Sequence, residues 1–66
     1  MMNAQALKAE IARAGMTQKQ VAQSIGISAN TFSQKLKKGT FGINEANEIA
    51  ELLNIADPGA IFFASR

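Results

Sequence analysis

The chain has 66 residues, 47% of them hydrophobic, with no Cys, no His and a formal net charge of +2. This composition argues against disorder, and the missing residue types exclude disulfides, ordinary zinc sites and the commonest catalytic base. We therefore expect residues 1–66 to form one small all-α domain without a cofactor. We expect no enzyme, because the five carboxylates form no recognisable pair of nucleophile and base.

No segment has the pattern of a membrane span or a signal peptide. The longest apolar stretch, residues 60–64, is far shorter than the roughly 20 residues that cross a bilayer. Near the N-terminus, Lys8, Glu10 and Arg13 interrupt the apolar positions. A cytoplasmic location is the resulting expectation.

The net charge conceals an asymmetry along the chain. Residues 1–43 hold six basic residues and one acidic residue, a balance of +5. Residues 44–66 hold four acidic residues and one basic residue, a balance of −3. A surface charged in this way would attract a polyanion to one side.

The first predicted helix covers about residues 3–14. Leu7, Ile11 and Ala14 recur at helical spacing and predict a buried stripe, and Gly15 supplies a stop signal.

A second helix is predicted over residues 17–24. The Thr17 hydroxyl can accept a hydrogen bond from the Gln20 amide while the Gln20 side chain reaches back, which is the capping-box arrangement. Gly26 follows where the chain must turn sharply, and a residue without Cβ can adopt the positive φ that such a turn needs.

A third helix over residues 29–37, capped by Ser28, completes the pattern of a helix-turn-helix. Ala22 is small enough to let the second and third helices cross closely. The predicted inward-facing residues of the pair are Val21, Ile25, Ile27, Phe32 and Leu36. The second helix of such a unit lies in the major groove of DNA.

Two more short helices are predicted after a loop bracketed by Gly39 and Gly42. Asn44 is predicted to cap a helix over residues 45–53. Its apolar face consists of Ala46, Ile49, Ala50 and Leu53. Asp57 followed by a proline then begins a short fifth helical turn. Five short helices without a strand pattern indicate an all-α fold.

The polar face of the third helix is the predicted base-reading surface. With the apolar residues facing inward, the candidates for base contacts are Ala29, Asn30, Ser33 and Gln34. Asn and Gln amides can each form a pair of hydrogen bonds with adenine, and the Ala29 methyl group can meet a thymine methyl group. The alternative interpretation is an ordinary solvated helix face.

Phosphate contacts are predicted from two other clusters, at the start of the second helix and around the end of the third. The candidate residues are Thr17, Gln18, Lys19, Thr31, Lys35, Lys38 and Thr40. Exposed amides at a helix N-terminus bind anions, and such contacts set position rather than sequence preference. Lysines near the end of a helix also complement its dipole, which is compatible with phosphate binding.

The pattern resembles the Cro and CI type helix-turn-helix of phage repressors and the wider xenobiotic-response-element regulators. The residues that carry the likeness are Gln18, Ala22, Gly26, Ile27, Ser28, Phe32, Ser33 and Gly39, and the likeness continues to the D-P-x-x-I-F-F ending. The resemblance implies a lambda-repressor-like domain of five helices that binds operator DNA, typically as a dimer on a two-fold site. It also implies a phosphate contact by Gln18 and base contacts by Ala29, Asn30 and Gln34.

The chain departs from this family pattern at one position. The family often has an apolar residue three positions after the one matched by Phe32, whereas this chain has Lys35 there and Leu36 next. The pattern leaves open whether the end of the third helix is rotated or ends differently, and with it the role of Lys35.

The apolar C-terminal segment is a candidate dimer contact through Ile61, Phe62 and Phe63. Two adjacent aromatic residues cannot both point the same way on a helix, so one of the two phenylalanines is left for a second subunit. Simple packing within the chain is the alternative.

Taken together, the sequence predicts a DNA-binding transcriptional regulator, a repressor that occupies an operator as a homodimer, with no small-molecule ligand evident. The alternative is a protein-interaction module of the same fold, such as an antitoxin-like partner or an adaptor.

Overall fold

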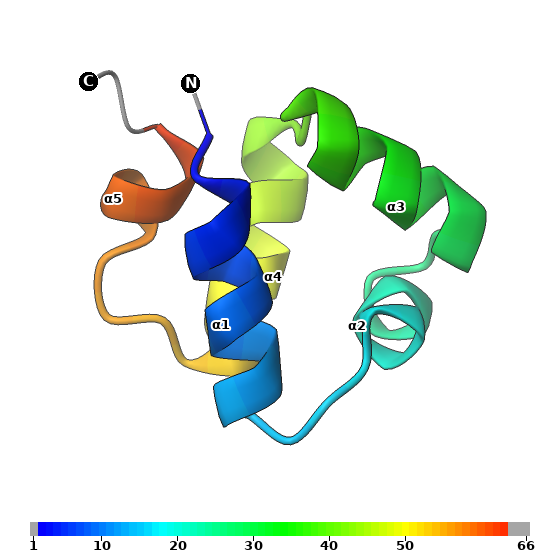
Figure 1. Cartoon of the computed structure of the whole chain (residues 1–66), viewed down its shortest axis with the longest axis horizontal. Coiled ribbons are helices and arrows are strands. Elements are labelled where there is room, and N and C mark those ends of the chain that lie inside the picture. The colour runs from blue at the N-terminus through cyan, green and yellow to red at the C-terminus, as the bar shows by residue number, and fades with distance from the viewer. Residues whose placement is uncertain (1, 64–66) are drawn as a thin grey trace.

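The computed structural model describes residues 2–63, which form five α-helices (Figure 1). The helices are α1 (Ala4–Arg13), α2 (Gln18–Ser24), α3 (Ala29–Lys38), α4 (Ile43–Leu53) and α5 (Pro58–Phe62). This arrangement confirms the predicted all-α fold. Among the described residues, no helix combines the length and apolar character needed to cross a membrane.

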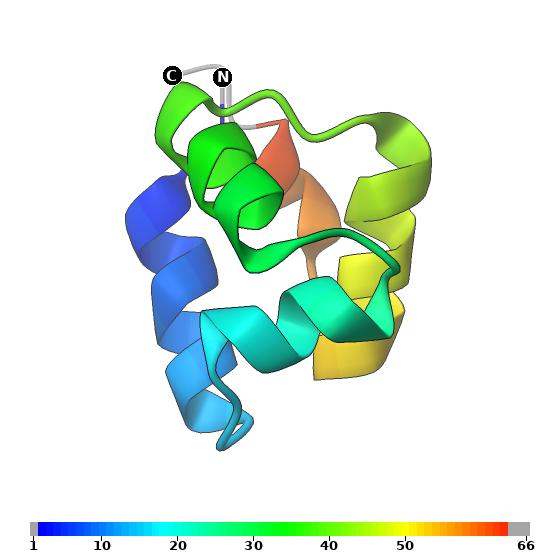
Figure 2. The ribbon, with the colours of Figure 1, turned by 90° about the vertical axis from the view of Figure 1, so that its right-hand side faces the viewer.

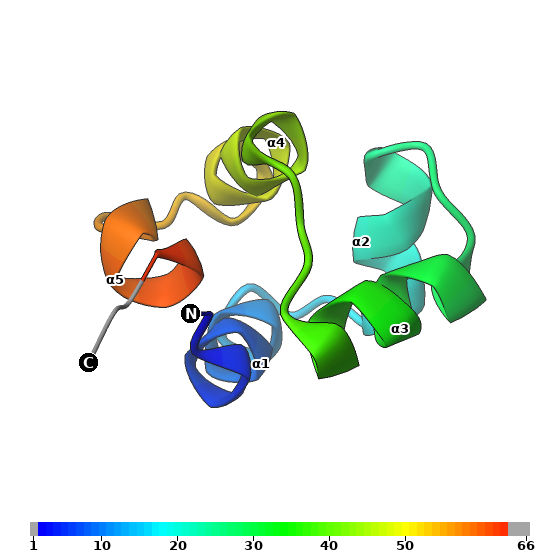
Figure 3. The same ribbon diagram turned by 90° about the horizontal axis from the view of Figure 1, so that it is seen from above.

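The helix pair α2 and α3 lies at one end of the molecule and α5 at the other, with α1 and α4 between them (Figure 3). Figure 2 looks onto the α2–α3 end, with α1 on one side and α4 on the other. The pair that forms the helix-turn-helix therefore packs against α1 and α4, the helices that precede and follow it in the sequence.

Local hydrogen bonds explain where most helices begin. The predicted capping box is present: the Gln20 amide donates to the Thr17 hydroxyl at 3.1 Å, and the Thr17 amide donates to the Gln20 side chain at 2.9 Å. Ser28 caps α3 by accepting from the Thr31 amide, and Asp57 caps α5 by accepting from the Ala60 amide. These caps were predicted from residue type and spacing, and the structure confirms them.

The predicted start of α4 was wrong. This helix begins at Ile43 with Gly42 as its N-cap, and Asn44 lies inside its first turn. Glycine has no capping side chain, but the Gly42 amide donates to the Glu45 carboxylate at 3.0 Å. The reach of Glu45 back to this amide stabilises a start two residues earlier than predicted.

The first and third helices also differ slightly from the prediction. Ala14 is exposed as the C-cap of α1 and does not belong to its buried stripe. The third helix extends to Lys38 and ends at Gly39, which adopts the left-handed conformation with φ +68°. Phe32 and Leu36 are both buried, so α3 stays regular beyond Lys35.

One hydrophobic core joins all five helices. Its buried residues are Leu7, Ile11, Val21, Ala22, Phe32, Leu36, Ala46, Ile49, Leu53, Ile61 and Phe62. Ala22 is fully buried where α2 meets α3, as predicted for a close crossing. Ile25 and Ile27 are half-buried against the core.

Phe41, in the loop before α4, extends this core and was missed by the sequence analysis. Its ring centroid lies 5.1 Å from that of Phe32 in a tilted arrangement and 6.2 Å from that of Phe62 in an edge-to-face arrangement. Such geometries are favourable for aromatic pairs. Phe41 thereby links α3 to α5.

Candidate nucleic-acid interface

Helix α3 carries an exposed, largely polar face because its two large apolar side chains, Phe32 and Leu36, point into the core. All four predicted base-reading residues, Ala29, Asn30, Ser33 and Gln34, are exposed on this helix. Asn30 and Gln34 are four positions apart, so they lie one above the other on one side of the helix. The structure therefore leaves the amide groups free to approach a ligand.

A hollow lies on the flank of α3 that faces α1 and α2. Its lining residues are Ala4, Lys8, Gln18, Ser33, Leu36 and Lys37. Gln18 is the first residue of α2 and was a predicted phosphate contact. The fold adds Lys8 and Lys37, which sequence analysis did not assign because nothing local relates a lysine on α1 to the end of α3.

A second hollow lies on another flank of α3, toward the loop before α4. It brings together Gln34 with four predicted phosphate-binding residues, and its lining residues are Thr31, Gln34, Lys35, Lys38 and Thr40. The side chain of Lys38 is exposed here. Two other predicted contacts, Thr17 and Lys19, are exposed near the start of α2 but line neither hollow.

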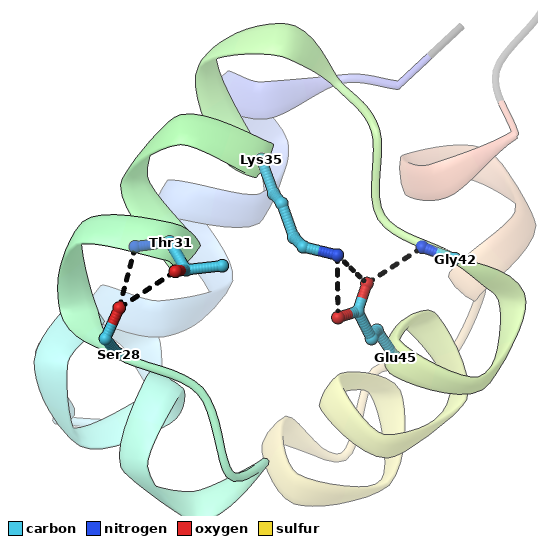
Figure 4. A network of polar contacts seen from close by, with 5 residues as sticks. All are labelled: Ser28, Thr31, Lys35, Gly42 and Glu45. Carbon is cyan, nitrogen blue, oxygen red and sulfur yellow. Dashed lines mark hydrogen bonds and ion pairs between the residues drawn. The ribbon is translucent and has the colours of Figure 1, made fainter.

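A polar network behind the second hollow holds Lys35 (Figure 4). The Lys35 ammonium group donates to both carboxylate oxygens of Glu45 at 2.9 Å. The hydrogen bond from the Gly42 amide, followed by that from Lys35, lowers the pKa of Glu45 below its ordinary value. The carboxylate is therefore ionised at neutral pH, and Lys35 is neutralised by a partner that sequence analysis did not foresee.

Ser28 and Thr31 form a second local link at the start of α3 (Figure 4). The Ser28 hydroxyl donates to the Thr31 hydroxyl at 2.9 Å and accepts from the Thr31 amide at 3.1 Å. The Thr31 hydroxyl oxygen is thus already used as an acceptor, which leaves its own proton available for an anion.

The C-terminal apolar residues divide between core and surface. Ile61 and Phe62 are buried in the core of the chain itself, so they are not available to a second subunit in this structure. Phe63 is 53% exposed. Of the three predicted dimer contacts, Phe63 alone faces solvent.

A family model described as a Cro/C1-type HTH DNA-binding domain matches residues 6–62. The chain belongs to this family. The match to the Cro/C1-type domain covers the whole of α2 and α3 and both hollows except Ala4. Comparisons with curated proteins and with solved structures gave no match.

Family membership makes this Cro/C1-type domain a DNA-binding regulator with DNA as its partner. The resemblance predicted from the helix-turn-helix residues is confirmed. In residues 2–63, no three His, Cys, Asp or Glu side chains gather where they could hold a metal ion.

Proposed function

We propose that this protein is a sequence-specific transcriptional regulator that places α3 in the major groove and represses by occupying an operator. The observation that carries this proposal is the arrangement around α3, where an exposed amide-bearing face is flanked by two hollows lined with lysines. A major groove presents base edges between two phosphate backbones, and this arrangement is complementary to it.

Base reading is assigned to the exposed face of α3. Asn30 and Gln34 each carry an amide that can pair with N6 and N7 of adenine, and their spacing suits neighbouring base pairs. Ala29 offers a methyl group to thymine, and Ser33 offers a hydroxyl group on the side of the first hollow.

Phosphate binding is assigned to the residues around the two hollows and the start of α2. In the first hollow, Gln18 is joined by Lys8 and Lys37. In the second hollow, the free groups are Thr31, Lys38 and Thr40. Thr17 and Lys19 lie near Gln18 in the chain and extend the phosphate-binding surface of the first hollow. These groups supply affinity and orientation, whereas base contacts supply specificity.

Two copies are proposed to bind a two-fold operator. Half-sites of helix-turn-helix dimers lie about 34 Å apart. The chain measures 29 × 21 × 19 Å between its outermost Cα atoms, so two copies fit side by side at that spacing. The exposed Phe63 is the proposed apolar contribution to the contact between them. Sedimentation of the protein alone and on a selected site would measure the number of copies directly.

The decisive experiment selects bound sites from a random DNA library and then compares three variants on the selected site. Gln34→Ala should cost roughly 1–3 kcal/mol of binding free energy at one base-pair position. Lys38→Ala should weaken binding to all sequences alike and reduce the salt slope by about one. Gln23→Ala, a matched change at an exposed residue of α2, should leave binding unchanged.

Equal losses on selected and random DNA for Gln34→Ala would contradict base reading by this residue. A chain that binds no DNA near physiological salt but copurifies with a protein would contradict the regulator and favour the interaction module.

A further inference from the structure

Lys35 lines the second hollow, yet its ammonium group is turned to α4 (Figure 4). Both oxygens of Glu45 accept from it at 2.9 Å. One of these oxygens also accepts from the Gly42 amide at 3.0 Å, which fixes the carboxylate to the backbone at the start of α4. The acceptor is therefore held in place independently of Lys35.

The pair is partly shielded from water. The Lys35 side chain is 31% exposed and the Glu45 side chain 21% exposed. An ion pair in this setting is screened less by salt than a fully exposed one. If Lys35 moved to a phosphate, the ionised Glu45 would lose its counter-charge close to a second anion. Withdrawal of Lys35 from the pair is thus opposed by charge as well as by its two hydrogen bonds to Glu45.

We propose that Glu45 restrains the affinity of this protein for DNA of any sequence by withholding Lys35 from the phosphates. The inference rests on the proposed DNA-binding function and refines it. Non-specific affinity depends on the number of phosphates that free lysines and arginines neutralise. A lysine neutralised by Glu45 does not add to that number, so Lys38 is the cation that serves the second hollow. Binding to DNA consequently depends more on the base contacts of α3 and less on contacts with phosphates.

The test uses Glu45→Gln in the full chain and a random-sequence DNA duplex. Glutamine retains the shape of the side chain and an oxygen that can accept from the Gly42 amide, but it has no negative charge. Anisotropy titrations between 50 and 200 mM salt, roughly the range over which phosphate contacts are resolved, give the slope of log K against log salt. One additional phosphate contact should steepen this slope by about 0.9, which corresponds to about fivefold tighter binding at 0.15 M salt.

Two further variants separate the restraint from a general change in charge. Glu48→Gln removes one negative charge from an exposed position on the same helix, where no ion pair with Lys or Arg is found within residues 2–63. It should steepen the slope much less than Glu45→Gln. The double variant Lys35→Gln with Glu45→Gln removes both members of the pair and should restore the wild-type slope.

Three results would overturn the inference. Equal slopes for Glu45→Gln and Glu48→Gln would show that only net charge matters. A double variant about one unit shallower than the wild type would show that Lys35 already contacts phosphate. Absence of binding by the wild type even at 50 mM salt, about the lower limit of the titration, would overturn the proposed function and the inference together.

A measurement on the unmodified chain remains decisive if Glu45→Gln does not fold. Nitrogen-detected or proton-detected NMR of the lysine ammonium groups should show that random DNA shifts the Lys38 signal and leaves the Lys35 signal in place. A Lys35 shift as large as that of Lys38 would contradict the restraint.

Discussion

Replacement of Gly26 by alanine should destabilise the turn between α2 and α3 through the backbone alone. Gly26 has φ +82°, and a Cβ atom built at this position meets no atom within 4 Å apart from those of its two chain neighbours. Clashes with groups beyond the adjacent residues therefore contribute nothing, and the cost is that of a left-handed L-residue, whose Cβ lies too close to the following carbonyl oxygen, about 1–2 kcal/mol. A 66-residue chain has a total stability of about 3–10 kcal/mol, so this cost is a considerable fraction.

Urea unfolding and thermal melting should both detect the change. A loss of 1 kcal/mol lowers the Tm of a domain of this size by about 4–8 °C. Gly59→Ala is the matched control, because Gly59 lies in α5 without a positive φ, and an added Cβ would make an ordinary 3.6 Å contact with Asp57. It should be neutral or stabilising by up to about 1 kcal/mol. Gly26→Asn should cost less than Gly26→Ala, because asparagine tolerates the left-handed region.

Equal stability of Gly26→Ala and Gly59→Ala would refute a backbone origin of the cost. A loss of more than about 3 kcal/mol in the free energy of unfolding of Gly26→Ala would contradict the open space around Gly26, because a penalty of that size requires disturbed packing.

Two other predictions concern the links from α4 to the rest of the fold. Arg13→Gln should lower the free energy of unfolding by about 1 kcal/mol, because the guanidinium group donates to the Leu53 carbonyl at 2.9 Å and binds the last turn of α4 to α1. The variant also removes the exposed ion pair of Arg13 with Glu10, which adds little to this loss. Lys8→Gln, at an exposed position of the same helix, is the control in the same urea titration. Glu45 has a lowered pKa in the folded state, so its stabilising contribution is present above the ordinary glutamate pKa of about 4.3 and is lost as the pH falls through the folded value. The difference in unfolding free energy between wild type and Glu45→Gln should therefore shrink between pH 7 and pH 3; an unchanged difference would contradict this origin.

Local signals predicted most of the fold correctly. The capping box of Thr17 and Gln20, the Ser28 cap and the positive φ of Gly26 all depend on residues within a few positions of one another. The predicted start of α4 was wrong because residue type alone favoured Asn44 as the cap. The hydrogen bond from the Gly42 amide to Glu45 stabilises the earlier start at Ile43.

The exposed face of α3 was predictable, whereas its flanks were not. Once Phe32 and Leu36 are inward, helical geometry leaves Asn30 and Gln34 outward. Which lysines surround that face depends on how other helices approach it. Lys8 reaches the first hollow because α1 packs beside the pair, and no local pattern encodes this proximity.

The sequence by itself determined the five-helix pattern, the helix-turn-helix and the side of α3 that faces outward, because hydrophobic period and capping act over a few residues. The tertiary structure alone decided that Phe41 joins the core between Phe32 and Phe62. It also decided that Lys35, the departure from the family pattern, is paired with Glu45. Both contacts join groups on different elements, and their formation depends on the orientation in which the helices pack.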